Sequence, residues 1–154
     1  MKQSRATIRY AKSLIDISEE NGVIDSSYDD MLLINSLCMS NKDLVNLLKT
    51  PIVKTDLKVK ILKELFSNSI SKLTLSFIIL ITNKKRESLL AEICSSFISL
   101  YKNKKNIKEV TVTTALPLDD SMRKELMNYV GAQNNTNIEL IEKVDESLIG
   151  GAII

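Results

Sequence analysis

Apolar residues recur with helical spacing along the N-terminal part of this chain, and the pattern then changes to the alternation of a strand. The densest apolar run lies between Ile70 and Tyr101 and reads ISKLTLSFIILITNKKRESLLAEICSSFISLY. Within it, Leu73–Ile81 is apolar almost all the way round a helical wheel, whereas the part from Leu89 onward keeps its apolar residues on one face. A helix that is apolar on every side must be covered on every side. Leu73–Ile81 is therefore either the buried axis of a bundle or a core helix that keeps one face for a partner.

A first helix is predicted between Ser4, which suits an N-cap, and Gly22, which stands where a glycine commonly follows a helix. Two adjacent, mainly apolar stripes run along this helix: Ile8, Ala11, Ile15 and Ser18 form one, and Tyr10, Leu14 and Ile17 form the other. The combined arc is wider than packing against a single core requires. This helix, like the one over Leu73–Ile81, has apolar surface to spare.

The other helices are predicted from caps and breakers. The second helix is predicted to be capped by Ser26 or Ser27. The third covers Leu44–Lys49, is opened by Ser40–Asp43 and is ended by Thr50-Pro51. The fourth runs from Thr55 to the break at Ser67-Asn68, and the fifth and sixth meet at Asn83–Lys85. We therefore expect residues 1–105 to form a six-helix bundle with short connections.

The pattern changes after a polar, basic stretch at Lys102–Asn106, which is a linker or a frayed helix end. The predicted order is then a strand over Glu109–Thr114 stopped by Pro117, a helix from Asp119 or Asp120 to about Val130 closed by Gly131, a turn at Asn134–Asn137, a strand over Ile138–Val144, and a third strand from Leu148. Residues 106–154 thus form a small α+β domain, and the fold class is mainly α. Since the printed chain stops within an apolar strand, we expect the C-terminal part of this domain to be missing.

Composition argues against catalysis. The 154 residues include no histidine, and they contain no cysteine pair at metal spacing, no glycine-rich phosphate loop and no nucleophile elbow. We expect no catalytic residue, no cofactor and no metal site. Cys38 and Cys94 both fall on apolar helix faces, which favours two buried thiols over a disulfide or a reactive thiol.

Charge and hydropathy limit the possible partners. A net charge of +2 is too balanced to indicate nucleic acid by itself. The N-terminus lacks the apolar region of a secretory signal, and the most apolar window, Phe77–Ile81, is far shorter than the roughly 20 residues of a membrane span. We expect a soluble protein whose membrane association is through a partner.

Several motifs together resemble the delta subunit of bacterial F-type ATP synthase, the counterpart of the mitochondrial oligomycin-sensitivity-conferring protein. They span almost the whole chain: Arg9-Tyr10-Ala11-Lys12 near the start, then Leu48, Pro51 and Lys58, then Asn83-Lys84-Lys85-Arg86-Glu87 with Leu89-Leu90-Ala91-Glu92-Ile93, and finally Val112-Thr113-Thr114-Ala115-Leu116-Pro117-Leu118 and Val144-Asp145-Glu146-Ser147-Leu148-Ile149-Gly150-Gly151. Each motif alone is weak, but their order on a bundle followed by an α+β unit is specific. Family members continue past the Gly-Gly pair with a further strand segment and a basic helix, which the printed sequence lacks.

The resemblance implies a non-catalytic stator subunit that joins the catalytic head to the peripheral stalk. In the family, the N-terminal bundle binds the N-terminal helix of an alpha subunit in a groove between its first and fifth helices, and the C-terminal domain binds the end of the b subunits. The implied location is peripheral, on the cytoplasmic face of the bacterial inner membrane, with membrane contact only through the complex and no nucleic acid bound.

The two helices with excess apolar surface are the first and the fifth, which is what helix-in-groove recognition needs. The candidate groove residues are Tyr10, Leu14 and Ile17 on one wall and Phe77, Leu80 and Ile81 on the other. The alternative is that all of these are ordinary core residues, and helical period alone does not settle which of the fifth-helix residues point outward.

Other residues admit more than one role. Arg86 is either a partner contact or a helix-start arginine bonded to a nearby carboxylate or carbonyl. Gly150-Gly151 favours a structural role as a strand bulge, and Asp145 a turn. A competing hypothesis for the whole chain is a helical nucleic-acid-binding module that uses lysines of the fourth helix and of residues 102–108; an enzyme ranks third.

Overall fold

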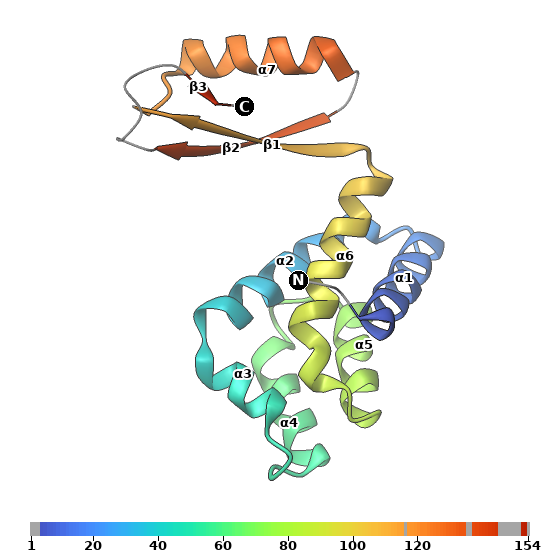
Figure 1. Cartoon of the computed structure of the whole chain (residues 1–154). Helices are drawn as coiled ribbons and strands as arrows, with labels where there is room; N and C mark the ends of the chain where they lie inside the picture. Colours follow the sequence, from blue (N-terminus) through green and yellow to red (C-terminus); the bar gives the residue numbers. More distant parts are fainter. Residues whose placement is uncertain (1–3, 116, 135–136, 145–151, 154) are drawn as a thin grey trace. The chain divides into compact units, whose positions relative to one another are not determined.

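A computed structural model describes residues 4–115, 117–134, 137–144 and 152–153. By its internal contacts the chain divides into two compact units, Met1–Tyr101 and Lys102–Ile154 (Figure 1). The helices α1 to α6 belong to the first unit apart from the last turn of α6, and the strands with α7 belong to the second. A mainly helical fold with an N-terminal bundle and a small α+β unit is thereby confirmed.

Helix α1 runs over Arg5–Glu20 and begins and ends as its sequence predicts. The Thr7 backbone N–H donates to Ser4 Oγ at 3.2 Å, so Ser4 is the N-cap. Gly22 follows the helix at φ +67°, a left-handed conformation that glycine adopts without steric cost.

The start of the second helix differs from the prediction. Helix α2 covers Ile24–Ser40, and Val23 precedes it without a side-chain capping bond, so neither Ser26 nor Ser27 is the cap. Ser27 is instead buried inside the helix, where its Oγ accepts a hydrogen bond from Ser18 Oγ of α1 at 2.9 Å. A buried hydroxyl needs a partner, and the contact between the two helices supplies one.

The short third helix begins earlier than predicted. Helix α3 covers Lys42–Lys49, and the Asn41 side chain accepts from the backbone N–H groups of Asp43 and Leu44. Helix α4 covers Thr55–Phe66, as predicted from Thr55 and the Ser67-Asn68 break.

Helices α5 (Lys72–Asn83) and α6 (Leu90–Lys104) are joined by a corner that holds the short 3-10 helix η1 (Glu87–Leu89). Lys85 turns the chain there at φ +56°, in the predicted corner region. Ser71 caps α5 by accepting from Thr74 N–H, and its own N–H donates to Asp30 Oδ2 of α2 at 3.0 Å. Asp30 is only 7% exposed, and this hydrogen bond gives its carboxylate a donor at the start of α5.

Every helix of the bundle contributes to one core. Its fully buried members include Leu14, Met31, Ile34, Leu62, Phe66, Ile78, Ile81, Leu90, Ile93 and Phe97. Cys38 and Cys94 are buried free thiols, and burial raises the pKa of both. At the end of α6, the ring of Tyr101 stacks on Tyr28 with centroids 4.0 Å apart, which fastens α6 to α2.

The second unit is a three-stranded sheet with one helix along it (Figure 1). Strands β1 (Ile107–Thr114) and β2 (Asn137–Val144) are parallel, with Val112 opposite Glu142, and the crossover between them carries α7 (Asp120–Asn134). Strand β3 (Ala152–Ile153) pairs antiparallel with β1 on its other side, in the order β2-β1-β3.

Several limits in this unit depart from the prediction. Helix α6 continues through Lys104, so the basic stretch is largely a helix end, and β1 begins at Ile107 rather than Glu109. Helix α7 passes Val130 and Gly131 and ends at Asn134; a glycine within a helix weakens it but does not stop it. Asp145 and Gly150-Gly151 lie outside the described residues.

Candidate partner-binding surface on α1 and α5

Helices α1 and α5 meet through an aromatic pair. The rings of Tyr10 and Phe77 lie with centroids 6.5 Å apart and planes at 71°, an edge-to-face contact. Such pairs contribute about 0.5–1.5 kcal/mol beyond the area they bury. The two helices that carry excess apolar residues in the sequence are therefore neighbours in the fold.

The predicted groove residues divide by exposure. Leu14, Phe77 and Ile81 are buried at 1%, 7% and 0% exposure, Tyr10 is partly buried, and Ile17 and Leu80 are 43% and 51% exposed. The buried residues belong to the bundle's own core and present no free surface in the isolated chain. Within the predicted set, the exposed apolar area lies on Ile17 and Leu80, with the partly buried Tyr10 between core and solvent.

Helical spacing explains this division. Ile17 follows the buried Leu14 by three positions, and Leu80 follows the buried Phe77 by three. Residues three apart share one side of a helix but are rotated by about 60°, so the second lies at the edge of the buried stripe. On both helices the apolar surface thus continues from the core out to solvent.

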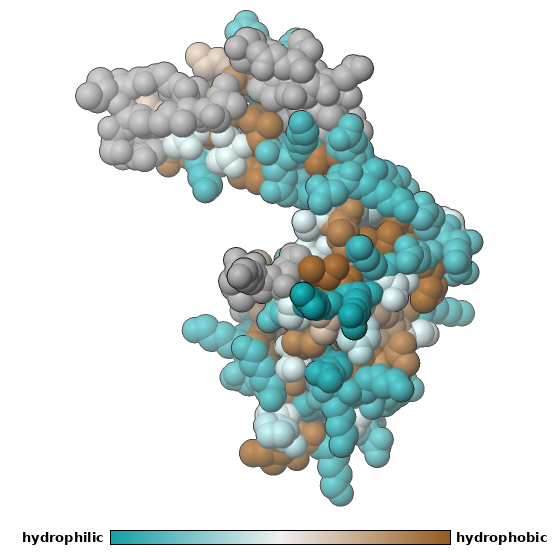
Figure 2. Space-filling model, turned by 45° about the vertical axis from the view of Figure 1, so that its right-hand side comes forward, coloured by the Kyte–Doolittle hydropathy of each residue, from teal (hydrophilic) through white to brown (hydrophobic). Residues whose placement is uncertain are grey.

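The side of the bundle that carries α1 is turned forward in Figure 2, where apolar atoms reach the surface among charged side chains. The charged residues of α1, such as Arg9, Lys12 and Asp16, are exposed. An apolar strip bordered by charges is typical of a surface that binds an amphipathic helix.

Arg86 lies at the corner that follows α5. Its backbone N–H donates to Ile81 O at 2.9 Å, and it precedes η1. Its side chain is exposed, and among the described residues it has no ion pair or side-chain hydrogen bond. A partner contact of Arg86 stays a prediction.

The sequence interpretation missed a buried ion pair. Lys58 Nζ lies 2.6 Å from Glu87 Oε1 and also donates to Leu48 O at 3.2 Å, with Lys58 only 3% exposed. The competing nucleic-acid hypothesis needs the lysines of the fourth helix to be accessible, and Lys58 is not. Its spacing from Leu62 and Phe66 places it on the buried stripe, and this signal could have identified it.

The second unit exposes a separate mixed surface. Arg123 of α7 bonds Glu142 of β2 at 2.6 Å, which lowers the pKa of that carboxyl, and Lys102 lies 2.6 Å from Glu139 Oε2. Apolar side chains are exposed on both elements: Met122 and Met127 on α7, and Ile141 and Val144 on β2.

The described residues also bear on two other possibilities, a metal site and a membrane-spanning helix. They contain no group of three or more histidine, cysteine, aspartate or glutamate side chains placed to hold a metal ion. None of the helices in the described ranges has the length and apolar character needed to cross a bilayer.

Comparison with known proteins agrees with this picture. Residues 6–154 match the family model described as ATP synthase delta (OSCP) subunit. The chain is 42% identical over 154 residues to ATP synthase subunit delta of Cytophaga hutchinsonii, covering 100% of this chain and 84% of that protein. It is 34% identical over 151 residues to ATP synthase subunit delta of Chlorobium phaeobacteroides, covering 98% and 84%.

A solved structure shares the fold. A chain in the mitochondrial ATP synthase hexamer of Toxoplasma gondii superposes with a TM-score of 0.76 at 21% identity, covering 98% of this chain and 86% of that one. None of these matches supports the nucleic-acid-binding hypothesis.

Proposed function

The chain belongs to the ATP synthase delta (OSCP) subunit family of the F-type ATP synthase peripheral stalk, and from this premise we propose that it is a non-catalytic stator subunit that binds a helix of the catalytic head on α1 and α5. The proposed occupant is the N-terminal helix of an alpha subunit. The observation that carries the proposal is the apolar area left open on Ile17 and Leu80 beside the contact between Tyr10 and Phe77.

Order-of-magnitude free energies indicate that this surface alone binds a partner helix with modest affinity. Fully burying a large apolar side chain contributes about 1.5–3 kcal/mol. Ile17 and Leu80 are already about half buried, so a partner gains roughly half of that from each. Association itself costs on the order of 4–15 kcal/mol. A contact with few anchors is therefore of modest affinity, and a stator that resists rotor torque requires a second attachment.

The second attachment in this proposal is the end of the b subunits, bound by the C-terminal α+β domain. Exposed apolar residues on α7 and β2, among them Met122 and Val144, support a protein contact there. Two linked contacts raise the overall affinity through their high effective concentration. Residues 1–105 then serve the head and residues 106–154 serve the stalk. The protein reaches the cytoplasmic face of the bacterial inner membrane only through the complex.

The test is sedimentation of the full chain with the soluble catalytic head purified from the same organism. We expect co-sedimentation, and we expect it to be lost when the alpha subunits lack their N-terminal helix. Binding that survives this truncation would contradict the role of α1 and α5. Failure to sediment with an intact head would contradict the proposed function altogether.

A further inference from the structure

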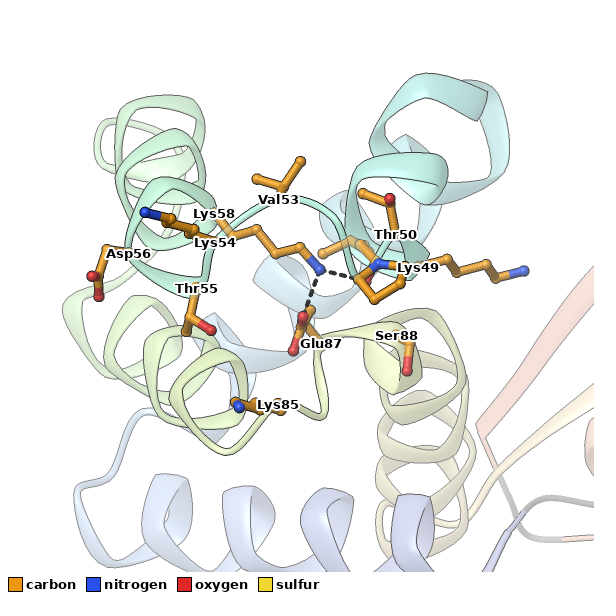
Figure 3. Close-up of a pocket in the computed structure, with 12 residues that line it drawn as sticks. Lys49, Thr50, Val53, Lys54, Thr55, Asp56, Lys58, Lys85, Glu87 and Ser88 are labelled. Carbon is orange, nitrogen blue, oxygen red and sulfur yellow. Dashed lines mark hydrogen bonds and ion pairs between the residues drawn. The ribbon is translucent and has the colours of Figure 1, made fainter.

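A pocket of about 600 Å³ lies at the end of the bundle where the α3–α4 connection meets the corner after α5 (Figure 3). Its walls come from residues 48–51, 53–56 and 58 on one side and from Lys85, Glu87 and Ser88 on the other. We propose that this pocket binds an acidic peptide segment of a partner protein. The site is distinct from the apolar surface of α1 and α5.

The floor of the pocket is a buried ion pair. Lys58 reaches in from α4 to Glu87 Oε1 at 2.6 Å and to Leu48 O at 3.2 Å, so it ties α4 to the end of α3 and to η1 (Figure 3). Glu87 is 9% exposed, and its Oε2 has no hydrogen-bond partner among the described residues. That oxygen is closed off from solvent, so the ion pair serves as the floor of the pocket and recognition falls to the groups around the opening.

The rim of the pocket is basic. Lys49, Lys54 and Lys85 are exposed, and none of them forms an ion pair within the described residues. Lys58 and Glu87 neutralise each other, which leaves three lysines against one acidic residue, Asp56, among the lining residues. The side chains of Lys49, Lys54 and Asp56 all extend away from the centre of the pocket in Figure 3. The net field at the opening is therefore positive.

The start of α4 strengthens this field. Lys54 is the residue before the helix and makes no side-chain capping bond, and Asp56 in the first turn offsets only part of the positive end of the helix dipole. An anionic group is favoured at such a helix end. A peptide supplies such groups with its acidic side chains.

An apolar neighbour favours a protein segment over a small anion. Ile52, in the same α3–α4 connection, is 89% exposed, and the adjacent Val53 is half-buried against the pocket. Inorganic phosphate would leave Ile52 in water, whereas a peptide can cover it with an apolar residue beside its acidic ones. Acidic residues interspersed with leucine are the composition that this surface fits.

The probe is a seven-residue peptide, EDLEDLE, added to the full isotope-labelled chain at low salt while backbone amide NMR signals are followed. We expect shifts in residues 49–58 and 85–88 and weaker binding as salt is raised. The control peptide KKLKKLK should leave these signals in place. Equal shifts with both peptides, or shifts scattered over the bundle, would overturn the proposal.

Charge reversal locates the site. Lys54→Glu with Lys85→Glu alters two exposed side chains and should weaken EDLEDLE binding by about tenfold. Lys12→Glu, on the exposed side of α1, is the matched control and should leave binding unchanged. Saturation of the same amides by inorganic phosphate with no further effect of the peptide would identify a small-anion site and overturn the proposal. Binding of the alpha-subunit helix should survive the double charge reversal, so failure of one proposal is distinguishable from failure of the other.

Discussion

Leu80→Asp is the substitution that separates a binding residue from a core residue on α5. Leu80 is 51% exposed and lies at the edge of the buried stripe. If a partner helix covers it, a charge there opposes binding. If it belongs to the core, the same charge opposes folding.

The expected cost to folding is small. The buried half of the side chain contributes roughly 1 kcal/mol, and the weaker helix propensity of aspartate adds about 0.5 kcal/mol. A typical domain has about 5–15 kcal/mol of stability, so the bundle should stay folded. In the complex, the exposed half of Leu80 loses a further contact worth roughly 1 kcal/mol, and burying the carboxylate without a partner costs about 1–3 kcal/mol more. Each 1.4 kcal/mol is about tenfold in affinity, so binding should weaken by roughly 30-fold or more.

The chain offers a matched control in Leu57 of α4, which is also 51% exposed. Leu57→Asp introduces the same charge at the same exposure on a different helix. The assay is calorimetric titration of a peptide of the alpha subunit's N-terminal helix into the full chain, with circular dichroism to follow folding. Leu57→Asp should bind like the parent protein.

Two results would refute the reasoning. Equal weakening by Leu57→Asp and Leu80→Asp would show that negative charge anywhere on the bundle opposes the peptide. Loss of the helical signal in Leu80→Asp would show that Leu80 is a core residue despite its exposure.

Other substitutions test the interior of the bundle. Glu87→Gln leaves the Lys58 ammonium buried without its counter-charge and should lower the free energy of unfolding by about 3–5 kcal/mol in urea melts; a loss below 1 kcal/mol would show that the pair is solvated. Burial, together with the carboxylate of Asp25 that accepts its hydroxyl at 2.6 Å, raises the pKa of Tyr101 from 10 to about 12. The protonated phenol is thus favoured in the folded state, so its contribution to stability is complete below pH 10 and is lost as pH rises toward 12. Tyr101→Phe should lack this decline when the free energy of unfolding of both proteins is measured at pH 9 and pH 11. An equal decline in the two proteins would contradict the assignment. Cys94 is fully buried with a raised pKa, so a thiol reagent should label it only after unfolding, and rapid labelling of the native protein would contradict its place in the core.

Local signals in the sequence predicted much of the fold correctly. Ser4 and Gly22 mark the ends of α1 because capping and left-handed glycine are properties of a few neighbouring residues. Ser27 was wrongly predicted as a possible N-cap, because its hydroxyl accepts a hydrogen bond from Ser18 of α1 rather than capping α2. Gly131 did not end α7, although glycine is often found just past a helix end.

The candidate surface was only partly readable from the sequence. Periodicity identified α1 and α5 as helices with excess apolar residues, but it grouped Leu14, Ile17 and Leu80 together as candidate groove residues. Neighbouring helices cover Leu14 and leave Ile17 and Leu80 open, and that depends on where those helices pack.

The sequence by itself determined which segments are helical, where a bundle gives way to strands, and which two helices carry surplus apolar surface, because these follow from contacts within a few turns of the chain. The tertiary structure decided which of those apolar side chains stay in water and which charges are buried. Lys58 and Glu87 are 29 positions apart, and only the packing of α4 against the corner after α5 brings them together. Exposure and ion pairing over such separations depend on the arrangement of whole helices, which no local pattern specifies.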